Sequence, residues 1–387
     1  MFEHVLQVAM WASFLTIFLF YLSYFLVLYH FYKKGENNNN KSLELHYPYA
    51  SLIVPTYNEE KIIRKKIQNV EELNYPKDKI EVIFVDGCST DQTAKIIQDC
   101  TEKCGKFIKL IKQSRRGGYN TGISEGVLNS KGEIIVVTDA GAYHHPDALK
   151  HLVKHFKDSK VGAVTGKEIV LSSHKNELGP KLEAVYRDFY DFMRIAETRM
   201  DSTPDSKGEI LAIKRGVCMR VLAKLEVSPN ASFDSCVPYQ AKLEGYRTIY
   251  EPRARYYEYA PSTFMDRMRQ QIRRASVLIG SMLLFKSLFM NKKYNKFGLV
   301  IMPAHFVMLL ILPWLFLSGS ISVLILTMVN PIWLLLWAIP LTALLIPKSR
   351  LFLISFIQSQ IALIIAALRV ATHRGSLFIN TLPSTRK

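Results

Sequence analysis

The chain has 387 residues, enough for about two domains, and 49% of its residues are hydrophobic. Its formal net charge of +17 leaves nucleic acid, an anionic membrane surface and anionic substrates open as partners. The five cysteines lack the paired spacing and the further ligands of a zinc site, and scattered free thiols suit a reducing compartment.

The N-terminal region predicts a membrane anchor over residues 1–32. The run from 5 to 32 contains no Asp, Glu, Lys or Arg and is long enough to span a bilayer. It lacks a basic n-region and a small-residue cleavage site, so we expect an uncleaved anchor. Lysines 33, 34 and 41 follow it, which predicts an external N-terminus and a cytoplasmic position for the residues after 33.

A polar linker is predicted over residues 33–48, and the block 49–261 that follows alternates apolar runs with helical stretches. The predicted strands are 50–55, 80–85, 107–111, 133–138 and 161–166. Isoleucines at helical spacing after the first strand, and Thr90-Asp91 at a helix start, predict helices between the strands. This alternation indicates an α/β fold with crossover connections and a mainly parallel sheet.

Polar clusters follow the first, second and fourth predicted strands, as "PTYNEE", "DGCSTD" and "DAGA". Since the carboxyl ends of parallel strands meet at one edge, we expect a ligand cleft there. Asp86 directly follows an apolar strand and has no evident capping role, whereas Asp91 suits a helix N-cap. Asp139 precedes the small residues 140–142, which let a ligand approach the backbone. Two acids at one edge suit a ribose or a divalent metal that holds a diphosphate.

Three further features each have two interpretations. His144 and His145 are candidate metal ligands, although a single histidine near a turn more often packs or lies at the surface. The paired glycines in 115–120 either let a phosphate approach a helix N-terminus or form a plain loop. Asp234 is either the N-cap of the helix that follows it or a general base that faces the cleft.

An amphipathic helix is predicted over residues 264–284, within a membrane-interface region spanning 262–296. Its apolar face carries Phe264, Met268, Ile272, Ala275, Ile279 and Leu283, and its polar face carries Asp266, Arg267, Arg269, Gln270, Arg273 and Arg274. Basic helices next to membrane spans usually lie along the bilayer surface, where Arg273 or Arg274 can also bind phosphate. We therefore expect a membrane partner and no nucleic acid partner.

Transmembrane helices are predicted over residues 297–372, from apolar runs at 297–317, 321–347 and 351–368. Asn330-Pro331 and Pro340 interrupt the second run, as in a kinked span or a helical hairpin. Three spans would place the basic tail, 373–387, outside, whereas a hairpin would place it in the cytoplasm. The protein is thus predicted to be a multi-pass integral membrane protein.

Taken in order, the motifs over residues 51–278 resemble the membrane-bound glycosyltransferases of family 2, which have the GT-A fold. "SLIVPTYNEE" resembles the family's opening strand and P-x-Y-N-E loop, and "VDGCSTD" resembles its DDGSTD motif. "VVTDAGA" stands at the DxD position, and "SFDSCVPYQAKLEGYR" resembles the ED…G-Y-R stretch. "QIRRA" stands where processive members carry QxxRW.

The resemblance implies a donor site made by Pro55, Tyr57, Glu59, Asp86 and Asp139. Asp86 would contact the nucleoside, with Pro55, Tyr57 and Glu59 around the base. Asp139 would contact the sugar or help to position a metal-bound diphosphate. A UDP-sugar is the expected donor in preference to a GDP-sugar.

The resemblance also implies catalytic and acceptor roles. Asp234 would be the catalytic base, and Gln271 and Arg274 would frame the acceptor or the diphosphate. The implied cofactor is Mg²⁺ or Mn²⁺ at Asp139, with His144 as a further candidate ligand.

Three positions depart from the family pattern: Gly141 replaces the second DxD aspartate, Phe233 replaces an acid and Ala275 replaces the QxxRW tryptophan. Gly141 leaves the metal in need of another ligand, and Ala275 removes the side chain on which a growing glycan stacks. The expected function is inverting transfer of a sugar to a membrane-associated lipid or glycan acceptor. A processive polysaccharide synthase, a catalytically weakened nucleotide-sugar-binding scaffold and a transporter are the alternatives.

Overall fold

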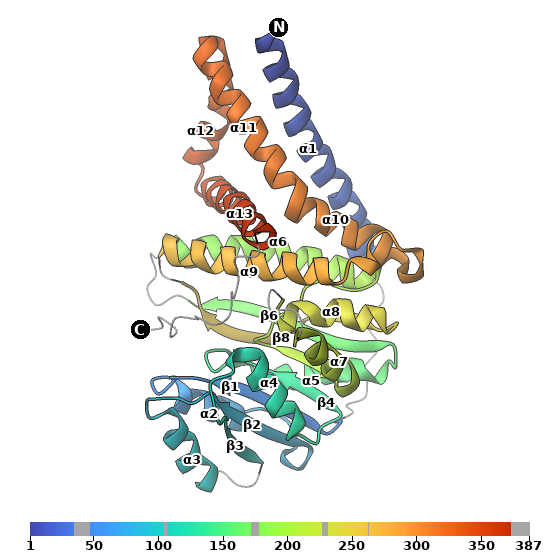
Figure 1. Ribbon diagram of the computed structural model, residues 1–387, viewed down its shortest axis with the longest axis vertical. Helices are drawn as coiled ribbons and strands as arrows, with labels where there is room; N and C mark the ends of the chain where they lie inside the picture. Colours follow the sequence, from blue (N-terminus) through green and yellow to red (C-terminus); the bar gives the residue numbers. More distant parts are fainter. Residues whose placement is uncertain (35–46, 104–106, 172–177, 227–230, 262, 373–387) are drawn as a thin grey trace.

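The computed structural model describes residues 1–34, 47–103, 107–171, 178–226, 231–261 and 263–372 (Figure 1). A single mixed sheet lies at the centre of the sheet domain, with the strand order β3-β2-β1-β4-β7-β6-β8-β5. The strands are β1 (Ala50–Thr56), β2 (Ile80–Asp86), β3 (Ile108–Lys112), β4 (Ile134–Val137), β5 (Tyr143–His144), β6 (Val161–Leu171), β7 (Leu211–Lys214) and β8 (Arg247–Tyr259). The five predicted strands are confirmed, and β5, β7 and β8 are additional.

Parallel pairing dominates the first half of the sheet, where β3, β2, β1 and β4 lie side by side. In the second half, β7 pairs antiparallel with both β4 and β6, β5 pairs antiparallel with β8, and β6 pairs parallel with β8. The carboxyl ends of β1, β2 and β4 therefore meet at one edge, as predicted. The predicted α/β fold with a mainly parallel sheet, as expected for a GT-A domain, is confirmed.

Helices cover both faces of the sheet. They are α2 (Ile63–Glu71), α3 (Thr93–Lys103), α4 (Gly118–Leu128), α5 (Ala148–Val153), α7 (Arg215–Leu225) and α8 (Phe233–Leu243). Alternate residues of the strands enter two buried clusters, so that Ile53 packs on one face and Leu52 on the other. A methyl group on Gly126 of α4 would lie 2.5 Å from Ile53 Cγ2, so glycine lets α4 approach β1 closely.

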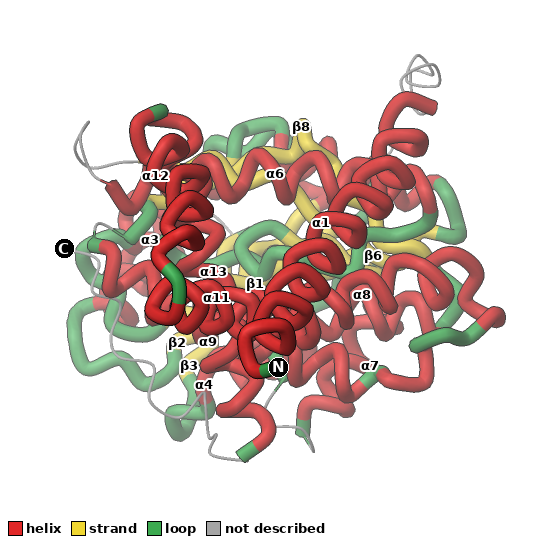
Figure 2. Tube along the Cα trace, turned by 90° about the horizontal axis from the view of Figure 1, so that it is seen from above, coloured by secondary structure: helices red, strands yellow, loops and turns green. Residues whose placement is uncertain are grey.

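Two long helices, α6 (Leu178–Met200) and α9 (Phe264–Leu284), form a layer between the sheet and the remaining helices (Figure 1). Seen from above, this layer and the outer helices cover much of the sheet (Figure 2). The predicted helix 264–284 is confirmed in its bounds. However, Arg267, predicted to lie on the polar face, is fully buried, because partners from α6 and α13 surround it.

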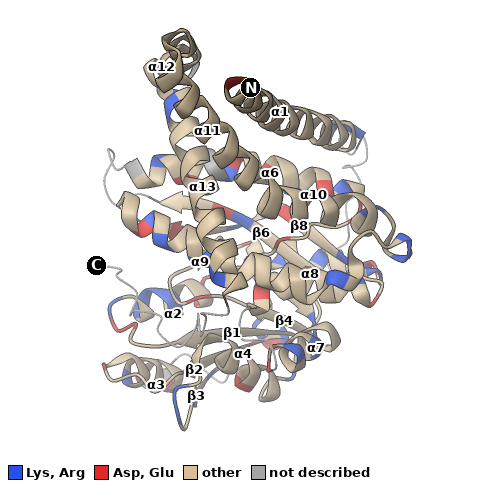
Figure 3. Cartoon of the chain, turned by 45° about the horizontal axis from the view of Figure 1, so that its top comes forward, with Lys and Arg blue, Asp and Glu red and all other residues tan. Residues whose placement is uncertain are grey.

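Three helices are long and apolar enough to cross a membrane: α1 (Phe2–Lys34), the helix from Phe297 to Val329 that includes α10 (Met302–Phe306) and α11 (Leu312–Val329), and α13 (Pro347–Ala371). The charged residues of α1 lie at its two ends, with Glu3 in the first turn and Lys33 and Lys34 in the last (Figure 3). The predicted break between 317 and 321 is wrong. A methyl group on Gly319 would lie 3.1 Å from the Phe14 ring, so this glycine is a contact between α1 and α11 within a continuous helix.

The break at Asn330-Pro331 is confirmed, because α11 ends at Val329 and the Asn330 side chain accepts a hydrogen bond from Ile332 N. A 3₁₀ segment (Pro331–Trp337) and α12 (Ala338–Leu345) lead into α13. Helix α13 packs along α9, through polar contacts at Arg267 and apolar contacts at Ala275 and Ile279. The predicted linker and tail lie largely outside the described residues.

The buried face of α6 carries a stripe of charged residues: Glu183, Arg187, Asp191, Arg194 and Glu197. Each has a partner on another element. Glu197, for example, accepts a hydrogen bond from Tyr24 of α1 and contacts His305 Nε2 of α10, both at 2.7 Å. This stripe joins the outer helices to the sheet domain.

Candidate functional site

The loops after β1 and β2 are held together by hydrogen bonds. Asn58 N donates to Ser89 Oγ (3.0 Å), and Glu59 N donates to Thr93 Oγ1 (2.7 Å). Asn58 adopts a left-handed conformation (φ 54°), which suits a polar turn residue. Pro55, Tyr57 and Glu59 are thereby placed at one end of the sheet.

Asp86 ends β2 and is buried beside Thr56, its register partner on β1. Its Oδ2 accepts a hydrogen bond from Ser89 N (3.1 Å), which orders the loop after β2. Asp91 accepts hydrogen bonds from Thr93 N (2.9 Å) and Glu60 N (3.2 Å), so it has the structural role expected of it. Asp86 therefore lies at the predicted edge with one carboxylate oxygen bound by the backbone.

Asp139 and Asp234 come together around Tyr119, the second residue of α4. The Tyr119 hydroxyl hydrogen-bonds to the Asp139 side chain. A methyl group on Gly208 would lie 2.8 Å from the Tyr119 hydroxyl oxygen and 3.6 Å from the Asp234 carboxyl carbon. Tyr119 thus links the acid that follows β4 to the acid at the start of α8.

Tyr119 stays protonated in this position. Burial, reinforced by the negative charges of Asp139, Asp234 and Glu209, raises the pKa of its hydroxyl well above the ordinary value. The hydroxyl is therefore a hydrogen-bond donor between carboxylates. The paired glycines of 115–120 predicted either a phosphate-binding helix start or a plain loop, and neither interpretation indicated a role for Tyr119.

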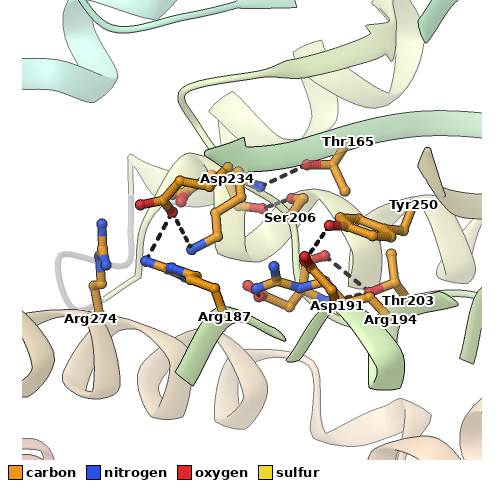
Figure 4. Close-up of polar contacts among 12 residues, drawn as sticks. Thr165, Arg187, Asp191, Arg194, Thr203, Ser206, Asp234, Tyr250 and Arg274 are labelled. Atoms are coloured by element: carbon orange, nitrogen blue, oxygen red, sulfur yellow. Dashed lines mark hydrogen bonds and ion pairs between the residues drawn. The ribbon is translucent and has the colours of Figure 1, made fainter. Parts of the chain in front are cut away.

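Asp234 lies in the first turn of α8, whose N-cap is Ser232, so Asp234 is not the cap. Burial raises the pKa of its carboxyl, and the carboxylates of Glu209 and Asp205 act in the same direction. Ser206 Oγ donates to the Asp234 backbone oxygen (2.6 Å), which attaches the 206–209 loop to this turn (Figure 4).

Arg274 of α9 reaches the same region from the helix layer (Figure 4). Its guanidinium lies 3.3 Å from Glu183 Oε1 and 3.8 Å from Glu209 Oε1. Burial alone would lower the pKa of Arg274, but Glu168, Glu183 and Glu209 raise it, so the side chain carries a fixed positive charge. Glu209, which no sequence motif indicated, connects Arg274 to the surroundings of Asp234.

Gln271 lies one turn before Arg274 on α9 and faces α13. Its amide lies 3.5 Å from Ser359 Oγ, and in the amide orientation that satisfies its neighbours its oxygen accepts from Arg267 Nη2 (3.0 Å). The structure therefore places Gln271 at the α9–α13 contact and Arg274 beside the loop of the candidate site.

His144 is buried, and its Nε2 lies 3.0 Å from Thr138 Oγ1 and 2.9 Å from the Glu209 backbone oxygen. Burial and the nearby Lys66 charge lower its pKa to about 3, so the ring is neutral. Lys66, also buried, donates to Thr138 Oγ1 (3.0 Å) and to Ala142 O (2.5 Å). These contacts brace the loop that follows Asp139.

Among the described residues, no group of three or more His, Cys, Asp or Glu side chains could hold a metal. Asp139 is the carboxylate that the site offers at the DxD position, and Gly141 adds no second one. This donor set fits a cation held mainly by the phosphates of a ligand, because Mg²⁺ commonly takes one or two protein carboxylates and keeps its remaining positions for phosphate and water.

Fold and site together define an α/β domain with a polar site at the carboxyl edge of its sheet, attached to long apolar helices. Residues 51–222 match the family described as Glycosyl transferase family 2. The chain therefore carries a glycosyltransferase family 2 domain.

Two curated relatives are glycosyltransferases. The chain is 35% identical over 141 residues to the beta-monoglucosyldiacylglycerol synthase of Nostoc sp. The aligned segment covers 35% of this chain and 29% of that protein. It is 26% identical over 254 residues to the poly-beta-1,6-N-acetyl-D-glucosamine synthase of Staphylococcus aureus. The aligned segment covers 65% of this chain and 59% of that protein. The matches thus span less than two thirds of these relatives.

A solved structure resembles nearly the whole fold. The mannosyltransferase PcManGT from Pyrobaculum calidifontis, in complex with GDP-Man and Mn²⁺, has a TM-score of 0.73 and 24% identity, with 97% of this chain and 100% of that chain covered. This likeness confirms the GT-A fold. Because that complex contains GDP-Man, it gives no support to the expected preference for UDP-sugars.

Proposed function

We propose that the protein is an inverting glycosyltransferase that moves a sugar from a nucleotide diphosphate sugar to a membrane-associated lipid or glycan acceptor. The observation that carries the proposal is the approach of Asp139 and Asp234 around Tyr119, at the carboxyl edge of the sheet. This edge lies beside the helix layer that joins the apolar helices, where a soluble donor and a membrane-bound acceptor can meet.

In this proposal, the donor occupies the edge formed by β1, β2 and β4. Pro55, Tyr57, Glu59 and Asp86 surround the nucleoside, and Asp139 contacts the sugar or its diphosphate. A divalent cation at Asp139 would neutralise charge on the diphosphate when bound.

Asp234 accepts the proton of the attacking acceptor hydroxyl as that oxygen bonds to the anomeric carbon and the nucleoside diphosphate leaves. Such general base assistance typically contributes about 10²- to 10⁴-fold in rate. Arg274 supplies positive charge toward the leaving diphosphate. Gln271 would act indirectly, by holding Arg267 and the α9–α13 contact. Asp139 offsets positive charge that develops at the anomeric carbon.

The localisation and domain limits form part of the same proposal. Residues 1–32 anchor a domain spanning 49–261, which faces the cytoplasm. Residues 262–296 lie at the membrane interface, and apolar helices occupy 297–372. The length and composition of the three apolar helices support this arrangement.

The test uses the full chain in lipid nanodiscs and measures nucleoside diphosphate release from a panel of UDP- and GDP-sugars, with and without Mg²⁺ or Mn²⁺. Polyprenyl phosphate and a membrane lipid extract serve as acceptors. We expect release that depends on donor and acceptor and is lost in Asp234→Asn. Asp99→Asn, on the exposed surface of α3, is the matched control and should retain activity.

The products separate the alternatives. Addition of one or a few sugars supports the proposal, whereas a long polymer would indicate a processive synthase. Donor binding without release under every condition would indicate a nucleotide-sugar-binding scaffold and would overturn the transferase proposal.

A further inference from the structure

A cluster of lysines follows α9, at the end of the helix layer that lies beside α1. The segment 285–296, here called the basic loop, contains no acidic residue and four exposed lysines: Lys286, Lys292, Lys293 and Lys296. Lys33 and Lys34 are exposed at the end of α1. Lys296 Nζ lies 4.5 Å from the centre of the Phe31 ring, so the loop and the end of α1 form one basic surface.

The basic loop is held against the start of the apolar helix that follows it. Asn291 Oδ1 accepts a hydrogen bond from Lys293 N (3.0 Å), and Met290 N donates to Gly298 O (3.0 Å). A methyl group on Gly298 would lie 2.5 Å from Asn291 O, so glycine lets the loop pack closely on this helix.

Two apolar side chains are exposed between these lysines. Phe289 is 38% exposed and Met290 is 60% exposed. Met290 adopts a left-handed conformation (φ 51°), which is uncommon for a residue with a long side chain. Exposed apolar side chains flanked by lysines are typical of a segment at a membrane interface, where the apolar groups enter the bilayer and the ammonium groups stay at its surface.

The two neighbouring helices determine the depth of the basic loop. The uncharged run of α1 ends at Lys33, and the apolar helix 297–329 begins directly after Lys296. The loop therefore lies where both apolar helices meet the sheet domain (Figure 1). In a bilayer, phospholipid headgroups occupy this level, and basic residues next to apolar helices attract the anionic ones.

The lysines of the basic loop make no ion pair within the part of the chain that the structure describes. Asp201, an acid near the start of the next helix, is paired with Lys242 (2.5 Å). The basic residues of α9 differ, because Arg267 and Arg274 both lie beside Glu183. The free positive charge expected on α9 is thus found largely in the loop after it.

We infer that the basic loop binds anionic phospholipids, with Phe289 and Met290 inserted among the lipids and the lysines at their phosphates. A zwitterionic headgroup is a weaker partner, because its own ammonium group balances the phosphate charge. A soluble polyanion would leave the two apolar side chains in water. The inference rests on the proposed placement of residues 262–296 at the membrane interface and not on the transfer reaction.

The test uses the full chain with Phe289→Trp in nanodiscs that contain equal amounts of phosphatidylglycerol and phosphatidylcholine. One of the two lipids carries brominated acyl chains, which quench tryptophan fluorescence on contact. The signal of the chain without this substitution is subtracted, since it contains four tryptophans of its own. We expect quenching to be about twofold stronger, or more, when phosphatidylglycerol is the brominated lipid.

The lysines are then replaced by glutamine in the Phe289→Trp chain. Joint replacement of the four lysines of the basic loop should abolish most of the preference for phosphatidylglycerol. The matched control removes the same charge from four exposed lysines of the sheet domain: Lys79, Lys95, Lys131 and Lys160. It should keep the preference. Thermal midpoints in detergent should be unchanged in both variants, because every replaced side chain is exposed.

Three results would overturn the inference. Equal quenching by the two lipids would mean that the loop does not select anionic headgroups, and an absence of quenching would place Phe289 outside the bilayer. An unchanged preference after replacement of the loop lysines would assign the selection to other residues. Nucleoside diphosphate release plays no part in these measurements, so each of these results leaves the proposed function untouched.

Discussion

Asp234 combines two properties that a general base requires. Burial and neighbouring carboxylates raise the pKa of its carboxyl, and a higher pKa makes it a stronger proton acceptor once it is ionised. The cost of keeping a negative charge there is reduced by Ser232 and by the Ser235 backbone, both of which hydrogen-bond to the carboxyl. The same surroundings determine how activity should respond to acid.

The rate of transfer should fall in acid at a pH above the ordinary aspartate pKa of 3.8. The base works only when ionised, so a raised pKa moves the loss of activity toward neutral pH. A profile of kcat/KM against pH, with separate checks that the protein stays folded, measures this limb. A rate that stays constant down to pH 4 would exclude Asp234 as the base.

Replacement of Tyr119 by phenylalanine should lower kcat by about 10- to 100-fold, comparable to the loss of a hydrogen bond to a charged group. The ring would still pack against the core, while Asp139 would lose its hydroxyl partner and the link toward Asp234. Donor KM should change little. Tyr75→Phe, which loses a buried hydroxyl bond to Pro48 far from the site, controls for stability alone. Equal kcat values in both variants would remove Tyr119 from the site.

Sequence pattern indicated where several candidate residues lie in the fold, but not which residues they contact. The position of Asp86 and Asp139 could be predicted because polar residues directly after parallel apolar strands lie at one sheet edge. The approach of both Asp139 and Asp234 to Tyr119 depends on how α4 and α8 pack against the sheet, which local pattern does not determine. Tyr119 was missed because a single tyrosine at the start of a helix has no distinctive spacing.

At the scale of the element, α6 shows why a charged pattern can mislead. Its charged residues recur at helical spacing, a pattern typical of a solvated face. In the fold they are buried, because β6, α9 and the 203–209 loop supply opposite charges. Arg187, for example, lies 2.9 Å from Glu168 of β6 and 2.6 Å from Glu183. The partners are distant in sequence, so the layer could not be predicted from α6 alone.

Arg267→Met should lower the free energy of unfolding by about 3 kcal/mol, the lower end of the range for breaking a buried ion pair. Glu183 would keep Arg187 and Arg274 as partners, but Ser355 and Gln358 of α13 would lose theirs. Arg269→Met is the matched control, since Arg269 is exposed and its 3.5 Å pair with Asp266 contributes about 0–1 kcal/mol. Thermal unfolding in detergent compares the two, and equal midpoints would contradict the structural role of Arg267.

The contact between α1 and α11 depends on a small residue. Gly319→Leu should destabilise the protein by about 1–3 kcal/mol through overpacking against Phe14 and Ser13. Ser318→Leu, on the neighbouring exposed face, is the control and should be neutral. Thermal midpoints in the same detergent decide between them. A tolerated Gly319→Leu would mean that the two helices do not pack closely at this position in the membrane.

At the scale of the molecule, the path of the chain favours one of the two predicted positions of the C-terminal tail. The helix from Phe297 to Val329 leads away from the sheet domain, and the segment from 331 to 345 leads back toward it (Figure 1). The start of α13 then lies near α6, where Lys348 and Asp188 border one cavity. Helix α13 continues along α9, on the side of the sheet domain.

The N-terminus and the C-terminal tail should therefore lie on opposite sides of the membrane, with the tail on the side of the sheet domain. This arrangement follows if α1 crosses the membrane once and the chain after α9 crosses it twice, out and back. It agrees with the preference of basic residues for the cytoplasm. Fusions to the full chain in a bacterial host test it. Green fluorescent protein after Lys387 should fluoresce, whereas alkaline phosphatase there should be inactive, and alkaline phosphatase before Met1 should be active. Active phosphatase after Lys387 would instead require a third crossing after α9, and the packing of α13 along α9 would then not hold in the membrane.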